Sequence, residues 1–343
     1  MKYAALEKSN FDKFINRLIQ RKKVVAPVEK SNNQYSFEPV TSASQIALKY
    51  IPTILPPKKY FMPQYETLAE YDISQGKQTM QAVVEYEEMI IFGIHTCDLA
   101  GIQNLNVVFS SKPYDPNYLT RKNNVLLIGL ECNDYCDEYA SCHLMGNDLP
   151  NGGYDLFFTD LGDYFLVHIN TVEGEELISG CCNEAKPEQI AALEKLREKK
   201  RKIFRNEVHI TASKIPEIFA KSYNSKVWEE IGKKCLGCAN CTNVCPTCYC
   251  FDVEDEPDLN LKTGKRIRVW DSCQNDPFAK VAGGEDFRKL RSERQRHRYY
   301  RKFKFPVDKY ARFFCTGCGR CSRTCMAGIN LKETLDSLVK ENI

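Results

Sequence analysis

Two similar cysteine runs near the C-terminal end constrain the fold of this chain more than any other feature. The first run has the spacing Cys-x2-Cys-x2-Cys-x3-Cys-Pro and consists of Cys235, Cys238, Cys241, Cys245 and Pro246. The second repeats the cysteine spacing without the proline and consists of Cys315, Cys318, Cys321 and Cys325. In such runs three cysteines hold one [4Fe–4S] cluster, and the fourth usually binds the other cluster of a two-cluster protein. The sequence therefore predicts two clusters with crossed ligation.

The crossed rule gives a definite ligand set for each cluster. The first cluster is predicted to take Cys235, Cys238, Cys241 and Cys325. The second cluster is predicted to take Cys315, Cys318, Cys321 and Cys245. Glycines at positions 237, 317 and 319 would let backbone N–H groups approach the clusters closely. Clusters of this kind carry single electrons.

Two other uses of cysteine fit this pattern less well. A zinc site usually combines two cysteine pairs separated by a dozen or more residues, whereas each run here places three cysteines within seven residues. The chain begins Met1-Lys2-Tyr3 and has no apolar stretch after a basic start, so no secretory signal is expected. In a reducing, anoxic cytoplasm, the 17 cysteines are better explained as metal ligands than as disulfide partners.

Length and residue patterns predict an α+β fold. With 343 residues the chain has room for about two domains. Residues 1–185 are expected to form a mixed α/β domain, because residues 89–94 and 125–130 are continuous apolar runs typical of buried strands. Residues 186–223 are expected to form a helical bridge, which begins with an Ala-, Leu-, Glu- and Lys-rich helix over residues 186–206. Residues 224–343 are expected to form a mainly helical, two-cluster [4Fe–4S] ferredoxin-like domain.

Nine cysteines lie outside the two runs and are candidates for a third metal centre. A single free cysteine is more often a small buried hydrophobic residue than a ligand. The adjacent Cys181 and Cys182 are interpreted as incidental, because neighbouring side chains rarely point at one metal. The candidate ligands of a third centre are Cys132, Cys142, Cys248, Cys250 and Cys273.

A basic segment with interleaved aromatic residues, 288–304, raises the alternative of a zinc-stabilised module that binds nucleic acid. The net charge of +3 is too small to support a polyanionic partner, because acidic stretches such as residues 252–258 offset the basic segment. We therefore interpret residues 288–304 as a solvated or subunit-docking segment. No stretch approaches the roughly 18–20 apolar residues of a membrane span, so no membrane association is expected.

The sequence displays no recognisable catalytic constellation. It contains neither a Gly-x-Gly-x-x-Gly nucleotide-binding turn after a strand nor a Walker A run. His95 and His143 lie near cysteines but are interpreted as core or surface histidines. The pattern indicates an electron-conducting subunit with no catalytic residue of its own. The enzyme alternative, a self-sufficient reductase, would need a substrate site that the sequence does not display.

Segments from both halves of the chain resemble a known family of [4Fe–4S] dicluster subunits of soluble redox complexes. In the C-terminal half the resemblance rests on residues 235–250 (CLGCANCTNVCPTCYC), 270–273 (WDSC), 282–284 (AGG) and 315–325 (CTGCGRCSRTC). In the N-terminal half it rests, in the same order as in the family, on residues 55–61 (LPPKKYF), 93–99 (GIHTCDL) and 128–132 (IGLEC). These segments are similar to the beta subunit of cytoplasmic sulfhydrogenases and to the dicluster subunit of anaerobic sulfite reductases. Met326 follows the second run, where the family often has proline.

The resemblance implies partners for the chain. Members of this family lie between a flavin-containing subunit, which handles NAD(P)H or ferredoxin, and a catalytic subunit. The catalytic subunit is a nickel–iron hydrogenase in one branch, which is our expectation here, and a sirohaem sulfite reductase in the other. The resemblance thus implies a cytoplasmic, anaerobic electron-transfer function.

Overall fold

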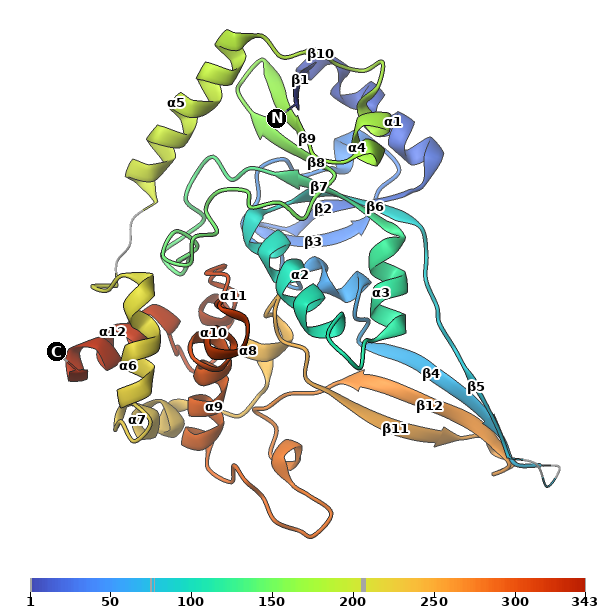
Figure 1. The fold of residues 1–343 in the computed structure, drawn as a ribbon, viewed down its shortest axis with the longest axis vertical. Helices are drawn as coiled ribbons and strands as arrows, with labels where there is room; N and C mark the ends of the chain where they lie inside the picture. The colour runs from blue at the N-terminus through green and yellow to red at the C-terminus, as the bar shows by residue number, and fades with distance from the viewer. Residues whose placement is uncertain (1, 75, 77, 205–207, 343) are drawn as a thin grey trace.

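The structure, a computed structural model, describes residues 2–74, 76, 78–204 and 208–342. Within these residues the strands form one eight-stranded and one four-stranded sheet, and a group of helices lies toward the C-terminal end (Figure 1). The chain is therefore mixed α/β, as the sequence predicts. Short 3-10 helices lie at Lys8–Asn10, Ala43–Gln45, Pro57–Tyr60, Ala212–Lys214 and Pro277–Ala279.

The larger sheet has a parallel centre with antiparallel edges. In spatial order its strands are β10 (Asn183–Glu184), β1 (Lys2–Glu7), β9 (Tyr164–Ile169), β8 (Leu156–Asp160), β7 (Val125–Leu130), β6 (Met89–Ile94), β2 (Lys23–Ser31) and β3 (Gln34–Pro39). The central strands β8, β7, β6 and β2 run parallel to one another. On β6, Ile90 and Phe92 point into the core on one face of the sheet and Ile91 into the core on the other. Both faces are therefore buried, which explains the unbroken apolar runs.

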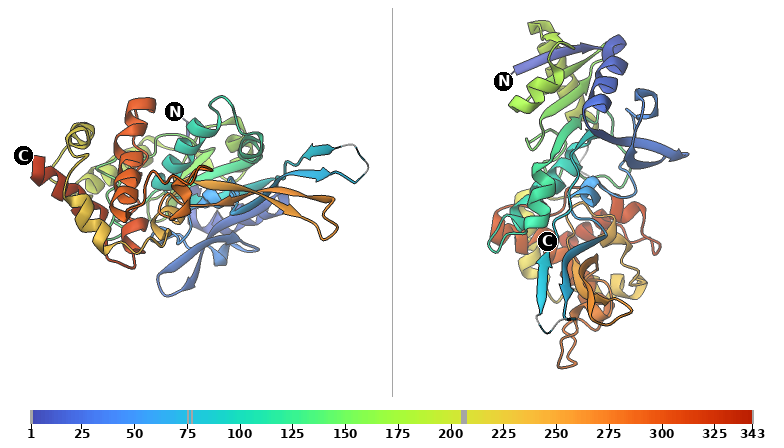
Figure 2. Two further views of the ribbon diagram at one scale, coloured as in Figure 1. Left: turned by 90° about the horizontal axis from the view of Figure 1, so that it is seen from below. Right: turned by 90° about the vertical axis from the view of Figure 1, so that its right-hand side faces the viewer.

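Helices cover both faces of this sheet (Figures 1 and 2). They are α1 (Phe11–Arg21), α2 (Thr96–Phe109), α3 (Pro116–Asn123), α4 (Val172–Ile178) and α5 (Pro187–Ile203). Helices α1 and α4 belong to the core on one face, and α2 and α3 to the core on the other. A buried ion pair joins the end of α5 to the residue that follows β7. The Lys200 ammonium lies 2.9 Å from the Glu131 carboxylate, and both side chains are buried.

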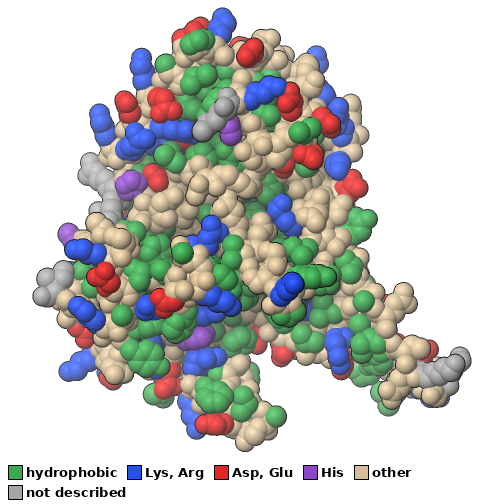
Figure 3. Space-filling model, in the orientation of Figure 1, with side chains coloured by type: hydrophobic (Ala, Val, Ile, Leu, Met, Phe, Trp, Pro, Cys, Tyr) green, Lys and Arg blue, Asp and Glu red, His purple; other side chains and the backbone are tan. Residues whose placement is uncertain are grey.

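The smaller sheet joins strands from the two halves of the chain. Its order is β11 (Phe251–Pro257), β12 (Thr263–Trp270), β4 (Tyr65–Asp72) and β5 (Thr79–Ala82), all antiparallel. The buried carboxylate of Glu66 on β4 accepts hydrogen bonds from Arg121 of α3 at 2.5 Å and from Arg268 of β12 at 2.6 Å. These contacts fix the base of the sheet, while its far end projects from the body as an arm (Figures 2 and 3).

The remaining helices lie in the C-terminal part of the chain. They are α6 (Ile215–Lys221), α7 (Val227–Lys234), α8 (Asn240–Asn243), α9 (Arg291–Phe303), α10 (Phe305–Tyr310), α11 (Arg320–Arg323) and α12 (Leu331–Asn342). Helices α6, α7, α9 and α12 pack around a third core. Phe219, Trp228, Tyr299, Phe303 and Leu338 are buried together in this core. No helix among the described residues combines the length and the apolar character needed to cross a bilayer.

The predicted elements can be compared with this arrangement. The helix predicted over residues 186–206 is observed as α5, and residues 205 and 206 lie outside the described part of the chain. The C-terminal part contains, besides its helices, the hairpin β11–β12, which the sequence analysis did not predict. The division at residues 185 and 223 stays a prediction.

Candidate iron–sulfur centres

The two cysteine runs fold in the same way. In each run the chain turns through two left-handed residues, Gly237 (φ 67°) and Ala239 (φ 62°) in the first and Gly317 (φ 72°) and Gly319 (φ 73°) in the second. A single helical turn follows in each case, α8 in the first run and α11 in the second. Left-handed backbone lets a short chain wrap around a common centre. The sequence repeat is therefore also a structural repeat.

A cavity forms inside each run and takes its fourth cysteine from the other run. The first cavity is lined by Cys235, Cys238, Cys241 and Cys325. The second cavity is lined by Cys315, Cys318, Cys321 and Cys245. Cys321 also reaches the wall of the first cavity, so the two cavities are neighbours. The structure thus brings together the same sets of thiols that the spacing rule groups.

The donor chemistry of both cavities fits iron–sulfur clusters. Each offers four thiols, the donors that [4Fe–4S] clusters use. Burial raises the pKa of Cys241 to about 12 and raises that of Cys315 above its usual value, so these two thiols are protonated when no metal is bound and must release a proton to bind one.

Buried polar atoms beside the cavities point to the same chemistry. Two of them are donors that have no hydrogen-bond partner among the described residues, Arg298 Nε and the Thr316 hydroxyl. Donors such as Arg298 Nε–H and the Thr316 hydroxyl suit cluster sulfurs, which accept hydrogen bonds.

Helix α9 places two buried cations between the thiols. Arg298 lines both cavities, and Lys302, one turn later, lines the second. Burial alone would lower the pKa of Arg298, but the electrostatic effect of the neighbouring Cys241 and Cys321 side chains raises it well above the usual value. The Lys302 ammonium donates to the Thr247 hydroxyl at 2.7 Å. Because a ligated cluster is anionic, cations fixed in the cavity walls would balance its charge.

These cations were missed in the sequence analysis. The basic segment 288–304 was interpreted there as solvated or subunit-docking, yet Arg294, Arg298 and Lys302 are buried. Their spacing of four residues places them on one face of α9. The four-residue spacing could have indicated a buried basic face, because nothing requires a solvated helix to repeat its basic residues on one face. The correction is that the inner face of this segment belongs to the site.

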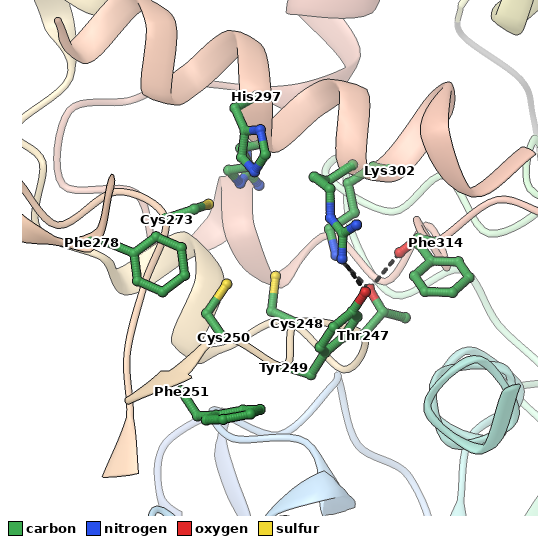
Figure 4. Close-up of a pocket in the computed structure, with 12 residues that line it drawn as sticks. Thr247, Cys248, Tyr249, Cys250, Phe251, Cys273, Phe278, His297, Lys302 and Phe314 are labelled. Atoms are coloured by element: carbon green, nitrogen blue, oxygen red, sulfur yellow. Dashed lines mark hydrogen bonds between the residues drawn. The ribbon is translucent and has the colours of Figure 1, made fainter. Parts of the chain in front are cut away.

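A third cavity of about 330 Å³ lies beside the other two. Its walls include Cys248, Cys250 and Cys273 together with His297, and Arg298, Arg301 and Lys302 also line it. Figure 4 shows the three thiols pointing toward one space that the His297 ring also faces. A hydrogen bond from Cys273 lowers the pKa of Cys250 to about 6 despite its burial. Three of the five candidate ligands of a third centre are therefore neighbours.

The other two candidates lie elsewhere. Cys132 is beside Cys136 in a separate cavity, of about 310 Å³, which His95 and Tyr50 also line. Cys142 is buried next to Gly317. The His95 ring is itself buried and stacks on Tyr50 at 3.8 Å between centroids. Among the described residues, no three His, Cys, Asp or Glu side chains are grouped as a single metal ion would require.

Comparisons with known proteins agree with this geometry. Residues 234–329, which include all eight cysteines of the two runs, match the family model described as a 4Fe-4S dicluster domain. Over 341 residues the chain is 36% identical to sulfhydrogenase 2 subunit beta of Pyrococcus furiosus, with 98% of each chain covered. No solved structure matches the chain. The chain therefore belongs to the family of the sulfhydrogenase beta subunit, and its cofactors are two [4Fe–4S] clusters.

Proposed function

We propose that this chain is an electron-transfer subunit of a multisubunit oxidoreductase. The observation that carries the proposal is the pair of neighbouring four-thiol cavities, which share Cys321 and Arg298 in their walls. When bound, the two clusters supply one-electron oxidation and reduction. The chain holds them, balances their charge through Arg298 and Lys302, and excludes water from the second site by burial. We assign this work to a ferredoxin-like unit of residues 224–343, joined through residues 186–223 to a support domain of residues 1–185.

We assign the cluster ligands by the crossed rule. Cys235, Cys238, Cys241 and Cys325 hold the first cluster, and Cys315, Cys318, Cys321 and Cys245 hold the second. The shared cavity walls support this assignment. A local assignment would instead need Cys245 to reach back into the first cavity, which it does not line.

We further propose the position of the chain in its complex. One neighbour is a flavin-containing subunit that handles NAD(P)H or ferredoxin, and the other is a catalytic subunit, for which a nickel–iron hydrogenase is the first choice. The name of the P. furiosus relative, a sulfhydrogenase subunit, supports this choice. The dicluster subunit of an anaerobic sulfite reductase is the alternative within the family. We propose that the complex is cytoplasmic.

A nucleic-acid-binding module is disfavoured by the burial of basic residues. Arg294, Arg298 and Lys302 of the basic segment face the protein interior, so they are not available to phosphates. The exposed residues that remain on α9 do not form the wide basic surface that duplex binding requires.

The first prediction tests the function directly. The isolated, cluster-loaded chain is expected to accept electrons from dithionite, seen as bleaching of its visible absorption. It is expected to show no NAD(P)H oxidation, hydrogen uptake or sulfite reduction, because a flavin, nickel or sirohaem subunit must supply those reactions. Sustained turnover of any of these substrates by the pure chain alone would reject an electron-transfer role.

We also propose a third iron–sulfur centre in the 330 Å³ cavity, held by Cys248, Cys250 and Cys273 with His297 as a fourth donor. A chain with three [4Fe–4S] clusters should contain about twelve irons. The double variant Cys250→Ser/Cys273→Ser is expected to lose about four of them. The matched control is Cys181→Ser/Cys182→Ser, which removes two thiols far from the cavities and should leave the iron content unchanged. About eight irons in the unaltered chain would rule out the third centre.

A further inference from the structure

The outer face of the second cluster site is covered by the N-terminal half of the chain. The backbone N–H of Ser141 donates to the carbonyl oxygen of Gly317 at 2.7 Å. This loop is so close that a Cβ on Gly317 would lie 2.4 Å from its backbone. Thr316 is only 2% exposed, and Pro246 is buried against Gly101 of α2. Nothing could reach this face without displacing the N-terminal half.

The equivalent face of the first cluster site is bare. The structural repeat pairs Leu236 with Thr316, Cys238 with Cys318, and Met326 with Pro246. Leu236 is 62% exposed and Met326 is 79% exposed. Cys238 is the only cysteine of the described residues that is classed as exposed. A Cβ on Gly237 would meet no atom closer than 3.7 Å.

At the paired positions 236 and 316 the residue types are the reverse of what burial within this chain would favour. The covered face has a polar threonine where the bare face has leucine. A single exposed apolar residue needs no explanation, but here Leu236 and Met326 each directly follow a cysteine that lines the first cavity. Apolar side chains at such a position are stabilised when a second protein removes them from water.

The rim of the bare face is basic. Lys233 and Lys234 end helix α7 directly before the first run, and both are exposed. Arg291, at the start of α9, is exposed and donates to the carbonyl oxygen of Cys235 at 2.6 Å. Three cations around an apolar centre favour a partner whose surface has acidic residues around an apolar centre.

We propose that this first-run face (Leu236, Cys238 and Met326, with the basic rim Lys233, Lys234 and Arg291) docks an acidic redox protein. The partner covers the first cluster site as residues 137–142 and α2 cover the second. Electrons then enter or leave the chain here, one at a time, at the cluster site nearest to solvent. The inference rests on the proposed electron-transfer function and adds the surface and the charge of the partner.

The test uses a reduced acidic [2Fe–2S] ferredoxin as the probe and the cluster-loaded full chain as the acceptor. One electron passes from the ferredoxin to the chain, and stopped-flow absorbance gives the second-order rate constant at several salt concentrations. In Lys233→Glu/Lys234→Glu the rate constant should fall about tenfold at low salt, and its dependence on salt should weaken. Leu236→Ser should lower the rate at every salt concentration, because it removes apolar contact and no charge.

The matched control is Lys195→Glu/Lys199→Glu on the exposed side of α5, which changes the net charge by the same amount. It should lower the rate constant by less than about twofold, because steering depends on local charge. An equal fall in the control, an unchanged rate in the first-run variants, or no transfer from the ferredoxin to the unaltered chain would overturn the proposal. Reduction by dithionite tests the electron-transfer function separately from the docking face. If dithionite reduces the clusters of every variant, the electron-transfer function stands even if the proposal of a docking face is overturned.

Discussion

Replacing Cys245 by serine is expected to damage the cluster bound by Cys315, Cys318 and Cys321, although Cys245 belongs to the first run in the sequence. The reason is geometric, because the chain turns at Pro246 and the Cys245 side chain enters the wall of the second cavity. Serine retains an oxygen donor, so the expected result is a shifted signal as well as a loss of iron. The measurement is EPR spectroscopy of the dithionite-reduced variant.

Two single-run variants provide the reference spectra for this experiment. Cys318→Ser reports damage to the second cluster, and Cys238→Ser reports damage to the first. The Cys245→Ser spectrum should match that of Cys318→Ser, and the reciprocal variant Cys325→Ser should match Cys238→Ser. If Cys245→Ser instead matches Cys238→Ser, ligation is local and the two ligand lists must exchange Cys245 and Cys325.

Replacing Arg320 by methionine is expected to destabilise the chain by about 3–5 kcal/mol, because it leaves the buried Asp98 carboxylate without its partner. The Arg320 guanidinium on α11 donates to both Asp98 oxygens, at 2.6 and 2.7 Å, and to the Thr53 carbonyl at 2.6 Å. This contact joins the second cysteine run to α2. Urea denaturation under anaerobic conditions should therefore show an earlier midpoint, accompanied by loss of the second cluster's EPR signal.

The same helix supplies the control for this prediction. Arg323 pairs with Asp137 of the N-terminal half at 2.5 Å, but both side chains are partly exposed. Arg323→Met should cost less than Arg320→Met, because its pair is 18% and 17% exposed and solvent screens it more than the fully buried Arg320 pair. Equal effects of the two variants would show that burial of the Arg320 pair does not matter to the fold.

The sequence was sufficient to predict those strands whose side chains follow a local apolar pattern. The strands β6 and β7 are unbroken apolar runs, and both were predicted within residues 1–185. The strand β11 could not be predicted in this way, because all seven of its residues are exposed and most are acidic. It is held by pairing with β12, including the ion pair between Asp255 and Arg266 at 2.8 Å. The strand β12 is in turn held by β4, which lies about two hundred positions earlier in the sequence, and a local period cannot show such a distant pairing.

The grouping of the cluster ligands was predictable, because it follows from the spacing of the cysteines. The run spacing grouped the thiols as the cavities do, because three ligands on one short turn have little freedom. Residues 137–142 cover Gly317, and Arg320 forms an ion pair with Asp98. Both contacts join distant parts of the sequence, so no local sequence pattern predicts them. The same holds for Cys248 and Cys273, which lie 25 positions apart in the sequence but share one cavity wall.

The central claim is that the two cysteine runs bind two [4Fe–4S] clusters that transfer electrons. Its most direct test is the content of iron, acid-labile sulfide and zinc in the anaerobically purified full chain, with EPR spectra before and after dithionite reduction. We predict equal amounts of iron and sulfide, at least about eight of each per chain, and signals that appear on reduction. Stoichiometric zinc with little iron, in a colourless protein without reducible signals, would contradict the account.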